Sequence, residues 1–85
     1  MQNGDEVKGG NTMYRFLVII EKGDTSYGAY CPDLPGCVAV GRTREEVEQN
    51  MREAIAMHIQ GMIEENEPIP LPHNDAEYMD ISLPT

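Results

Sequence analysis

Residues 31–46, CPDLPGCVAVGRTREE, decide the fold of this chain, because they join a tight turn, a short strand and the start of a helix. Pro35 pre-sets the backbone at the first central position of a turn, and Gly36 supplies the positive φ required at the next. Leu34 is held extended by the proline that follows it, and residues 37–40 are predicted to form a strand. The stretch holds no nucleophile, phosphate-binding loop or set of metal ligands, so it specifies shape rather than chemistry.

The helix that follows begins at a capping box. Thr43 and Glu46 have the spacing at which a threonine and a glutamate three residues later satisfy the free N–H groups of a helix start. The helix dipole also favours negative charge at Glu45 and Glu46. Asn66 and the prolines at 68, 70 and 72 end the helix after about 22 residues and predict an extended segment beyond it. One side of the helix carries a mostly apolar stripe, typical of a helix packed on a sheet. It consists of Val47, Met51, Ala54, Ile55, His58 and Met62.

Strands are predicted on both sides of this stretch. Residues 14–21 (YRFLVIIE) are apolar on both faces, as is typical of a central strand, and a short loop at 22–26 leads to a second strand at 27–31. Residues 76–83 (AEYMDISL) alternate apolar and polar side chains with the period of a half-buried edge strand. The order is therefore β-β-β-α-β, an α+β fold with a small antiparallel sheet and one long helix packed on one face.

The composition limits the classes of function. Six basic and fifteen acidic residues give a formal charge of −9, which opposes binding to nucleic acid and favours a basic partner. No apolar stretch approaches the roughly 20 residues that span a bilayer, and the first twelve residues lack the apolar core of a signal peptide. We expect a cytoplasmic protein without membrane contact. Self-association would stabilise it, since a domain of this size buries only about 60% of its unfolded surface.

The chain is predicted to consist of a leader and one domain. Residues 1–12 (MQNGDEVKGGNT) carry one large apolar side chain, Val7, and bury too little surface to offset the cost of ordering. They are predicted to be disordered, and the domain is placed at 13–85. Met13 is an alternative natural start.

Four residues invite a catalytic or metal-binding interpretation. His58 lies in the apolar stripe, where a packed, hydrogen-bonded histidine explains it better than a general base, because no nucleophile can be assigned to it. Cys31 and Cys37, with His58 and His73, would supply four zinc ligands, but their spacing matches no zinc pattern. The cysteines are equally well explained as small buried residues at strand ends, with a regulatory disulfide as an alternative. No cofactor or metal is expected.

The acidic side chains admit two interpretations besides catalysis. A metal-dependent nuclease needs several carboxylates that converge on divalent ions, and the first strand offers only Glu21, at its end. Most other acids lie on the exposed side of the helix or at 64–67. They form either a solvated face or an electrostatic surface that steers a basic partner. No residue receives a catalytic role, and the protein is not predicted to be an enzyme.

A family resemblance rests on four segments: residues 27–37 (YGAYCPDLPGC), residues 41–46 (GRTREE), the helix with Ala54, Ile55 and His58, and residues 67–70 (EPIP). Residues 13–83 resemble the N-terminal domain of HicB-type antitoxins, in which these segments have the same order and spacing. The resemblance implies a trimmed ribonuclease H-like fold without the nuclease carboxylates. It also implies an antitoxin that covers the active site of a small basic HicA-like toxin, a ribonuclease that cleaves messenger RNA.

Many family members continue into a DNA-binding domain, and a stand-alone domain without that extension is expected here. The predicted function is neutralisation of a HicA-like toxin by a homodimer or higher homo-oligomer. The alternative is an orphan homo-oligomeric interaction or small-ligand-binding domain without a toxin partner. Self-association is expected at Ile59, Ile63, Met79 and Ile81. Toxin contacts are expected at the turn and the helix start, at Tyr30, Pro32, Asp33, Leu34, Glu45 and Glu48.

Overall fold

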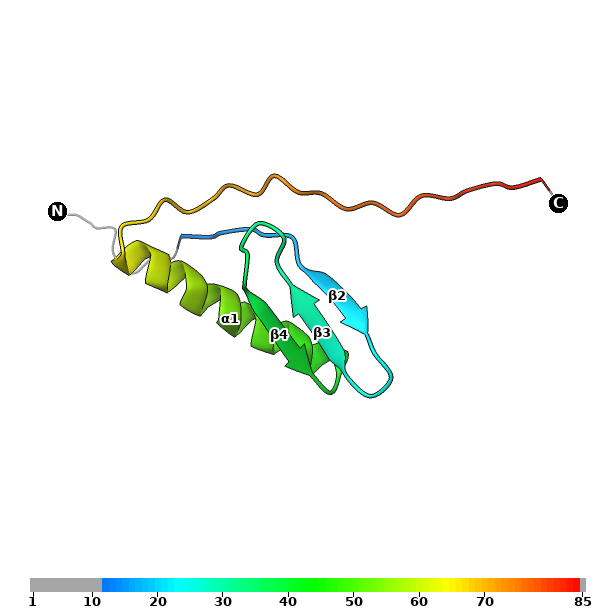
Figure 1. The fold of residues 1–85 in the computed structure, drawn as a ribbon, viewed down its shortest axis with the longest axis horizontal. Helices are drawn as coiled ribbons and strands as arrows, with labels where there is room; N and C mark the ends of the chain where they lie inside the picture. Colours follow the sequence, from blue (N-terminus) through cyan, green and yellow to red (C-terminus); the bar gives the residue numbers. More distant parts are fainter. Residues whose placement is uncertain (1–11, 85) are drawn as a thin grey trace.

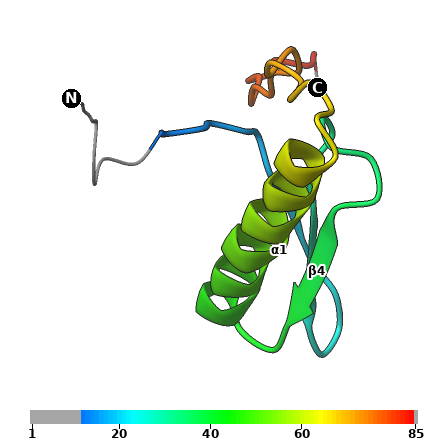
Figure 2. The ribbon, with the colours of Figure 1, turned by 90° about the vertical axis from the view of Figure 1, so that its left-hand side faces the viewer.

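The computed structural model describes residues 12–84 and contains three strands and one helix (Figure 1). The strands are β2 (Ile19–Lys22), β3 (Tyr27–Tyr30) and β4 (Val38–Gly41), and the helix is α1 (Arg44–Glu64). The sheet order is β2-β3-β4, and both neighbouring pairs are antiparallel. Helix α1 lies across one face of the sheet, against β3 and β4 (Figure 2). The predicted α+β class, a small antiparallel sheet with one long helix on one face, is confirmed.

The turn between β3 and β4 folds as predicted. The Leu34 backbone N–H donates to the Cys31 carbonyl at 3.0 Å, and the Cys37 N–H donates to the Leu34 carbonyl at 3.0 Å. Gly36 adopts a φ of 84°, which favours glycine over any residue with a side chain. This geometry turns Leu34 inward, and its side chain is 1% exposed.

Both ends of α1 are capped. The Glu46 N–H donates to Thr43 Oγ1 at 3.0 Å, and the Glu46 carboxylate accepts from the N–H of Arg42, just before the capping residue. At the other end, Asn66 has a φ of 57°, and the N–H of Glu67 donates to the Met62 carbonyl at 2.8 Å. This Schellman arrangement satisfies carbonyls that a helix end leaves free. The predicted helix is confirmed at both ends.

The core lies between α1 and the inner face of the sheet, and the β3–β4 turn closes one end of it. Helix residues face side chains from β3 and from the turn, and Val47 and Met51 are 0% and 2% exposed. The two cysteines flank the turn, at 3% and 4% exposure, so their interpretation as buried residues at strand ends is confirmed. The buried set is Ala29, Cys31, Leu34, Cys37, Val47, Met51 and Ile59.

The first strand differs from its prediction in length and in position. It spans Ile19–Lys22 rather than 14–21, because the ladder with β3 ends where Ile19 faces Tyr30. Beyond Tyr30 the chain enters the turn, so residues 14–18 have no strand beside them in the described sheet. The strand also lies at the edge of that sheet, although its sequence is typical of a central strand.

The predicted last strand at 76–83 is not formed. Residues 67–84 instead run as one extended segment past the sheet (Figure 1), and the molecule reaches 67 Å along its longest axis. A strand requires a neighbouring strand to hydrogen-bond with, and none of the described residues lies in that position. The predicted leader, residues 1–12, falls outside the described residues except for Thr12. Within residues 12–84, no helix is both long enough and apolar enough to cross a membrane.

Candidate functional site

An exposed apolar surface covers the face of the sheet opposite α1. The antiparallel register places Tyr30 beside Ile19 on one side and beside Val38 on the other. Tyr30, Val38 and Val40 are 40%, 62% and 70% exposed, whereas the intervening Ala39 packs against the core. We call Ile19, Tyr30, Val38 and Val40 the outer sheet patch. Exposed aromatic and branched side chains gathered on one face are typical of a protein-binding surface.

The toxin contacts predicted from the sequence do not form one continuous surface. Tyr30 is the last residue of β3 and belongs to the outer sheet patch, and Pro32 follows two residues later. Glu45 and Glu48 lie on the first turns of α1, at the opposite end of β4, where Glu48 Oε2 accepts from Arg44 Nε at 3.0 Å. The remaining two side chains are buried and offer a partner no surface, at 4% exposure for Asp33 and 1% for Leu34.

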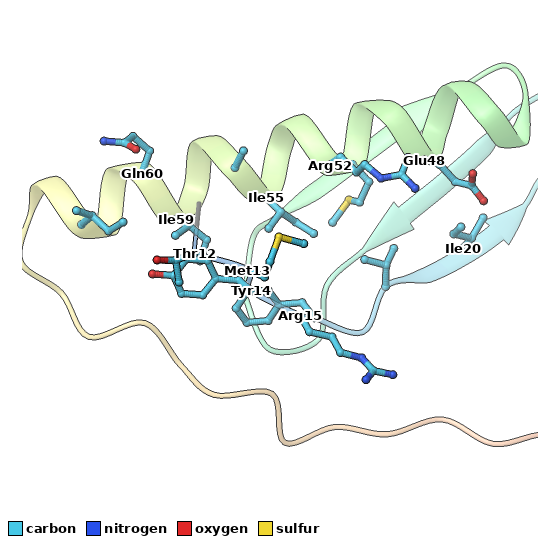
Figure 3. Close-up of a pocket in the computed structure, with 15 residues that line it drawn as sticks. Thr12, Met13, Tyr14, Arg15, Ile20, Glu48, Arg52, Ile55, Ile59 and Gln60 are labelled. Atoms are coloured by element: carbon cyan, nitrogen blue, oxygen red, sulfur yellow. The ribbon is translucent and has the colours of Figure 1, made fainter. Parts of the chain in front are cut away.

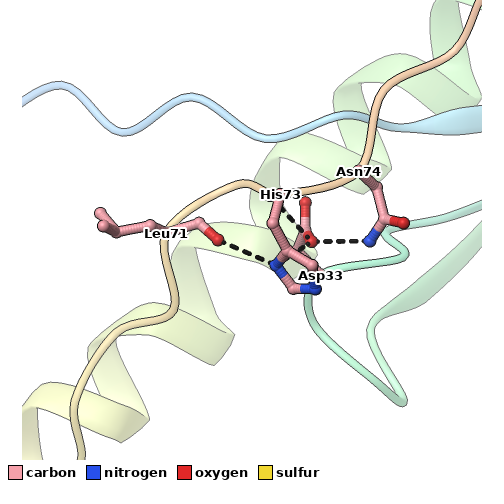
Figure 4. Close-up of polar contacts among 4 residues, drawn as sticks. All are labelled: Asp33, Leu71, His73 and Asn74. Atoms are coloured by element: carbon pink, nitrogen blue, oxygen red, sulfur yellow. Dashed lines mark hydrogen bonds and ion pairs between the residues drawn. The ribbon is translucent and has the colours of Figure 1, made fainter.

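Asp33 instead holds the C-terminal segment against the β3–β4 turn (Figure 4). Its Oδ1 accepts from Asn74 Nδ2 at 2.7 Å and from the backbone N–H of His73 at 3.3 Å. His73 Nδ1 lies 2.9 Å from the same oxygen and 3.2 Å from the Leu71 carbonyl. We call these contacts the Asp33 latch. Asp33 Oδ2 is buried and has no hydrogen-bond partner within residues 12–84.

The Asp33 carboxylate is held ionised by its donors. Burial opposes ionisation, but the hydrogen bonds from Asn74 and His73 outweigh it and lower the pKa of Asp33 below its usual value. A lowered folded-state pKa means that the latch is fully present above the ordinary carboxyl pKa, about 3.9. It is lost as the pH falls from there through the lower folded-state pKa.

Asp33→Asn is expected to release the C-terminal segment while leaving the sheet and helix folded. The amide side chain cannot accept the three donors as a carboxylate does, so the His73 backbone amide should exchange with solvent about ten-fold faster or more. Hydrogen exchange followed by NMR measures this, and the wild-type protein should approach the variant below about pH 4. Asp75→Asn is the matched control, because among residues 12–84 the one hydrogen bond that Asp75 Oδ1 accepts is a local one, from the N–H of Ala76 at 3.0 Å. Equal exchange in both variants would contradict the latch.

A second candidate surface is an apolar groove of about 900 Å³ between β2 and the flank of α1 (Figure 3). Val18 and Ile20 line it from the strand side, and Ile55, Ile59 and Ile63 line it from the helix. Residues 12–16 cross its end, where Met13 and Tyr14 approach the helix. Arg15 and Arg52 add positive charge to an otherwise apolar lining, with Glu48 as the acidic member.

The four residues expected to mediate self-association occupy different environments. Ile59 is 6% exposed and belongs to the core, although one side of it borders the groove. Ile63 is 47% exposed at the groove. Met79 and Ile81 lie on the extended C-terminal segment, at 71% and 72% exposure. The structure therefore puts two of the four at one groove and two on a segment that does not contact it.

The candidate metal and redox residues are dispersed or buried. Within residues 12–84, no three side chains of histidine, cysteine, aspartate or glutamate are placed to hold a metal ion. Cys31 and Cys37 are free thiols, and burial, with a further contribution from Cys31, raises the pKa of the Cys37 thiol. His58 is half-buried on α1, and His73 belongs to the Asp33 latch.

Comparison with known proteins identifies the family. The sequence model for the HicB-like antitoxin of bacterial toxin-antitoxin systems matches residues 16–82. The chain belongs to the HicB-like antitoxin family. A UPF0150 protein of Synechocystis is 44% identical over 59 residues, which cover 68% of this HicB-like chain and 75% of that protein. A 14.9 kDa protein of Haemophilus phage HP1 is 38% identical over 64 residues, and the HicB-like chain spans about half of its length, 48%.

Two solved structures share the HicB-like fold. A chain of the HicA3 and HicB3 toxin-antitoxin complex has a TM-score of 0.59 and 33% identity, covering 71% of this chain and 70% of that one. The N-terminal domain of the Burkholderia pseudomallei antitoxin HicB has a TM-score of 0.56 and 32% identity, covering 76% and 69%. Family membership therefore rests on sequence and fold together.

Sequence reasoning missed three features of this HicB-like domain. Val38 and Val40 were assigned to a strand without regard to which face they occupy, although alternation with the small Ala39 was the available signal. Asn74 was not singled out, and His73 was considered only as a zinc ligand. No local pattern connects either residue with Asp33, which lies 40 and 41 positions away.

Proposed function

We propose that this HicB-like domain is an antitoxin that binds and neutralises a small basic toxin of the HicA type and catalyses no reaction itself. The observation that carries the proposal is membership of the HicB-like antitoxin family. Likeness to a chain of the HicA3 and HicB3 complex supports it. The formal charge of −9 supports attraction to a basic partner, because complementary charge steers association. We place this action in the cytoplasm, without direct binding to nucleic acid.

We assign the toxin contact to the outer sheet patch. Its centre is apolar, with Tyr30 between Ile19 and Val38, and interface centres are enriched in aromatic side chains. One acidic side chain borders it, because Glu21 faces Gly28 in the same row of the sheet as Val40 and is exposed. An apolar centre bordered by a carboxylate suits a partner whose own apolar contacts are surrounded by lysine and arginine.

The test is co-expression with a HicA-type toxin from the same genome. The wild-type domain should restore growth and co-purify with the toxin. Val38→Lys should raise the dissociation constant of the complex about 100-fold, since it places an unpaired charge in the centre of the contact. Isothermal titration with a catalytically inactive toxin measures the effect.

Met57→Lys is the matched control, because Met57 is 75% exposed, comparable to 62% for Val38, and lies on α1 rather than on the sheet. If both lysine variants bind equally, the patch is not the contact surface. If the wild-type domain neither binds the toxin nor restores growth, the antitoxin function is wrong and the orphan interaction domain takes its place.

A further inference from the structure

The C-terminal segment has the pattern of a strand without the partner of a strand. Met79, Ile81 and Leu83 alternate with polar residues and are 71%, 72% and 73% exposed. Three apolar side chains in register on one side of an extended segment bury together when that segment joins a sheet. As the structure stands, this burial is absent.

Strand β2 has the sequence of a central strand but has a neighbouring strand on one side alone in the described sheet. Phe16, Val18 and Ile20 lie on one side of the chain and Leu17 and Ile19 on the other, a composition found in strands with neighbours on both sides. Yet β2 is an edge strand, and β3 is its one neighbour in the described sheet. An open edge of this kind presents a row of free N–H and C=O groups to which another strand can add.

The groove lies where an added strand would point its side chains. Helix α1 packs on β3 and β4, so its flank with Ile55, Ile59 and Ile63 extends over the space beside β2. A strand paired with β2 directs every second side chain toward that flank. Eight residues of strand span about 26 Å, so residues 76–83 are long enough to pair with the whole of β2 (Ile19–Lys22) and to continue beside residues 15–18.

We propose that residues 76–83 of a second copy of this chain pair with the free edge of β2 and insert Met79, Ile81 and Leu83 into the groove. The exchange is reciprocal, so that each copy supplies one segment and receives one, as in a closed two-fold dimer. The hydrogen-bonding groups of the segment and of the free β2 edge then pair with each other. Strand β2 becomes a central strand, as its sequence predicts.

Two observations favour a second copy of this chain as the occupant. The first is charge complementarity: Glu77 lies on the same side of the segment as Met79, and the groove is lined by Arg15 and Arg52. The second is direction: the Asp33 latch fixes His73 and Asn74 at the β3–β4 turn (Figure 4), and from there the chain runs on past the sheet (Figure 1). None of residues 75–84 is among the residues that line the groove of the same chain. The latch therefore keeps residues 76–83 away from the groove of their own chain and leaves them available to a second copy.

Light scattering on the full chain should give twice the monomer mass of 9.5 kDa. Ile81→Asp should raise the dimer dissociation constant about 100-fold or more, because it places a carboxylate in an apolar groove. Ala56→Arg should raise the dissociation constant by a similar factor, because Ala56 is exposed on α1 and lines the groove, which the longer side chain would fill. Met57→Asp and Met57→Arg are the controls, since Met57 is 75% exposed and is not part of the groove lining. Circular dichroism should show helix in all four variants.

Mixing the two impaired variants separates strand exchange from other modes of pairing. A copy with Ile81→Asp keeps its groove, and a copy with Ala56→Arg keeps its segment, so together they retain one of the two exchanges. The mixture should form a heterodimer more tightly than either variant forms a homodimer. A monomeric wild-type chain, or a dimer that tolerates Ile81→Asp, would overturn the proposal. These measurements contain no toxin, so they do not depend on the antitoxin function.

Discussion

Leu34→Ala is expected to lower the free energy of unfolding by about 2–5 kcal/mol, the usual cost of deleting a fully buried leucine side chain. Leu34 is 1% exposed and comes from a turn, where its position depends on the Leu34 and Cys37 backbone hydrogen bonds. The loss is large for a domain of this length, whose total stability is on the order of 5–10 kcal/mol. Urea denaturation followed by circular dichroism measures the change.

Val38→Ala provides the reference for that experiment. Val38 also loses methyl groups when changed to alanine, but it is 62% exposed, so the effect should stay within about 0.5 kcal/mol. If Leu34→Ala and Val38→Ala destabilise the protein equally, the turn does not contribute to the core as the structure describes. In that case Leu34 returns to the surface role that the sequence predicted for it.

Gly41→Ala is expected to lower the free energy of unfolding by about 1–3 kcal/mol, through overpacking rather than through a cavity. A Cβ atom at Gly41 would lie 2.5 Å from the backbone N of Val47 and 2.8 Å from its Cα. Backbone atoms cannot move aside as a flexible side chain can, so β4 and the first turn of α1 would have to separate. Thermal unfolding followed by circular dichroism measures the change.

Gly28→Ala is the control for this prediction. Gly28 also lies in a strand, but a Cβ atom there would meet nothing within 4 Å. Alanine at this position should be neutral or should stabilise the strand by about 0.5–1 kcal/mol, because glycine loses more backbone entropy on folding. A greater loss of stability from Gly28→Ala than from Gly41→Ala would show that β4 and α1 do not make this close contact.

The turn and the helix could be predicted because their signals are local. Gly36 needs only its own φ, and Thr43 reaches Glu46 three residues away, so neither depends on distant parts of the chain. The pairing of strands is not a local signal, since a strand forms only where a second strand lies beside it. Residues 76–83 have the right alternation, yet the described chain offers them no neighbour.

The candidate site was harder to predict for the same reason. The sequence predicted toxin contacts at the turn and at the helix start, and the structure shows that β4 separates the two and places them at opposite ends of a strand. The role of Asp33 depends on residues 40 and 41 positions away. Charge and family resemblance predicted the kind of partner that we propose, and the register of the sheet identified the exposed apolar face that we assign to the contact.

The two buried thiols give this domain an internal probe of its own opening. The thiolate is the nucleophile that attacks thiol-specific reagents, and Cys31 and Cys37 are 3% and 4% exposed on either side of the turn. The rate at which they are labelled therefore follows the frequency with which the turn leaves the core. Labelling of the unaltered chain can thus report the stability of the turn in a crude extract, with no introduced dye or tryptophan.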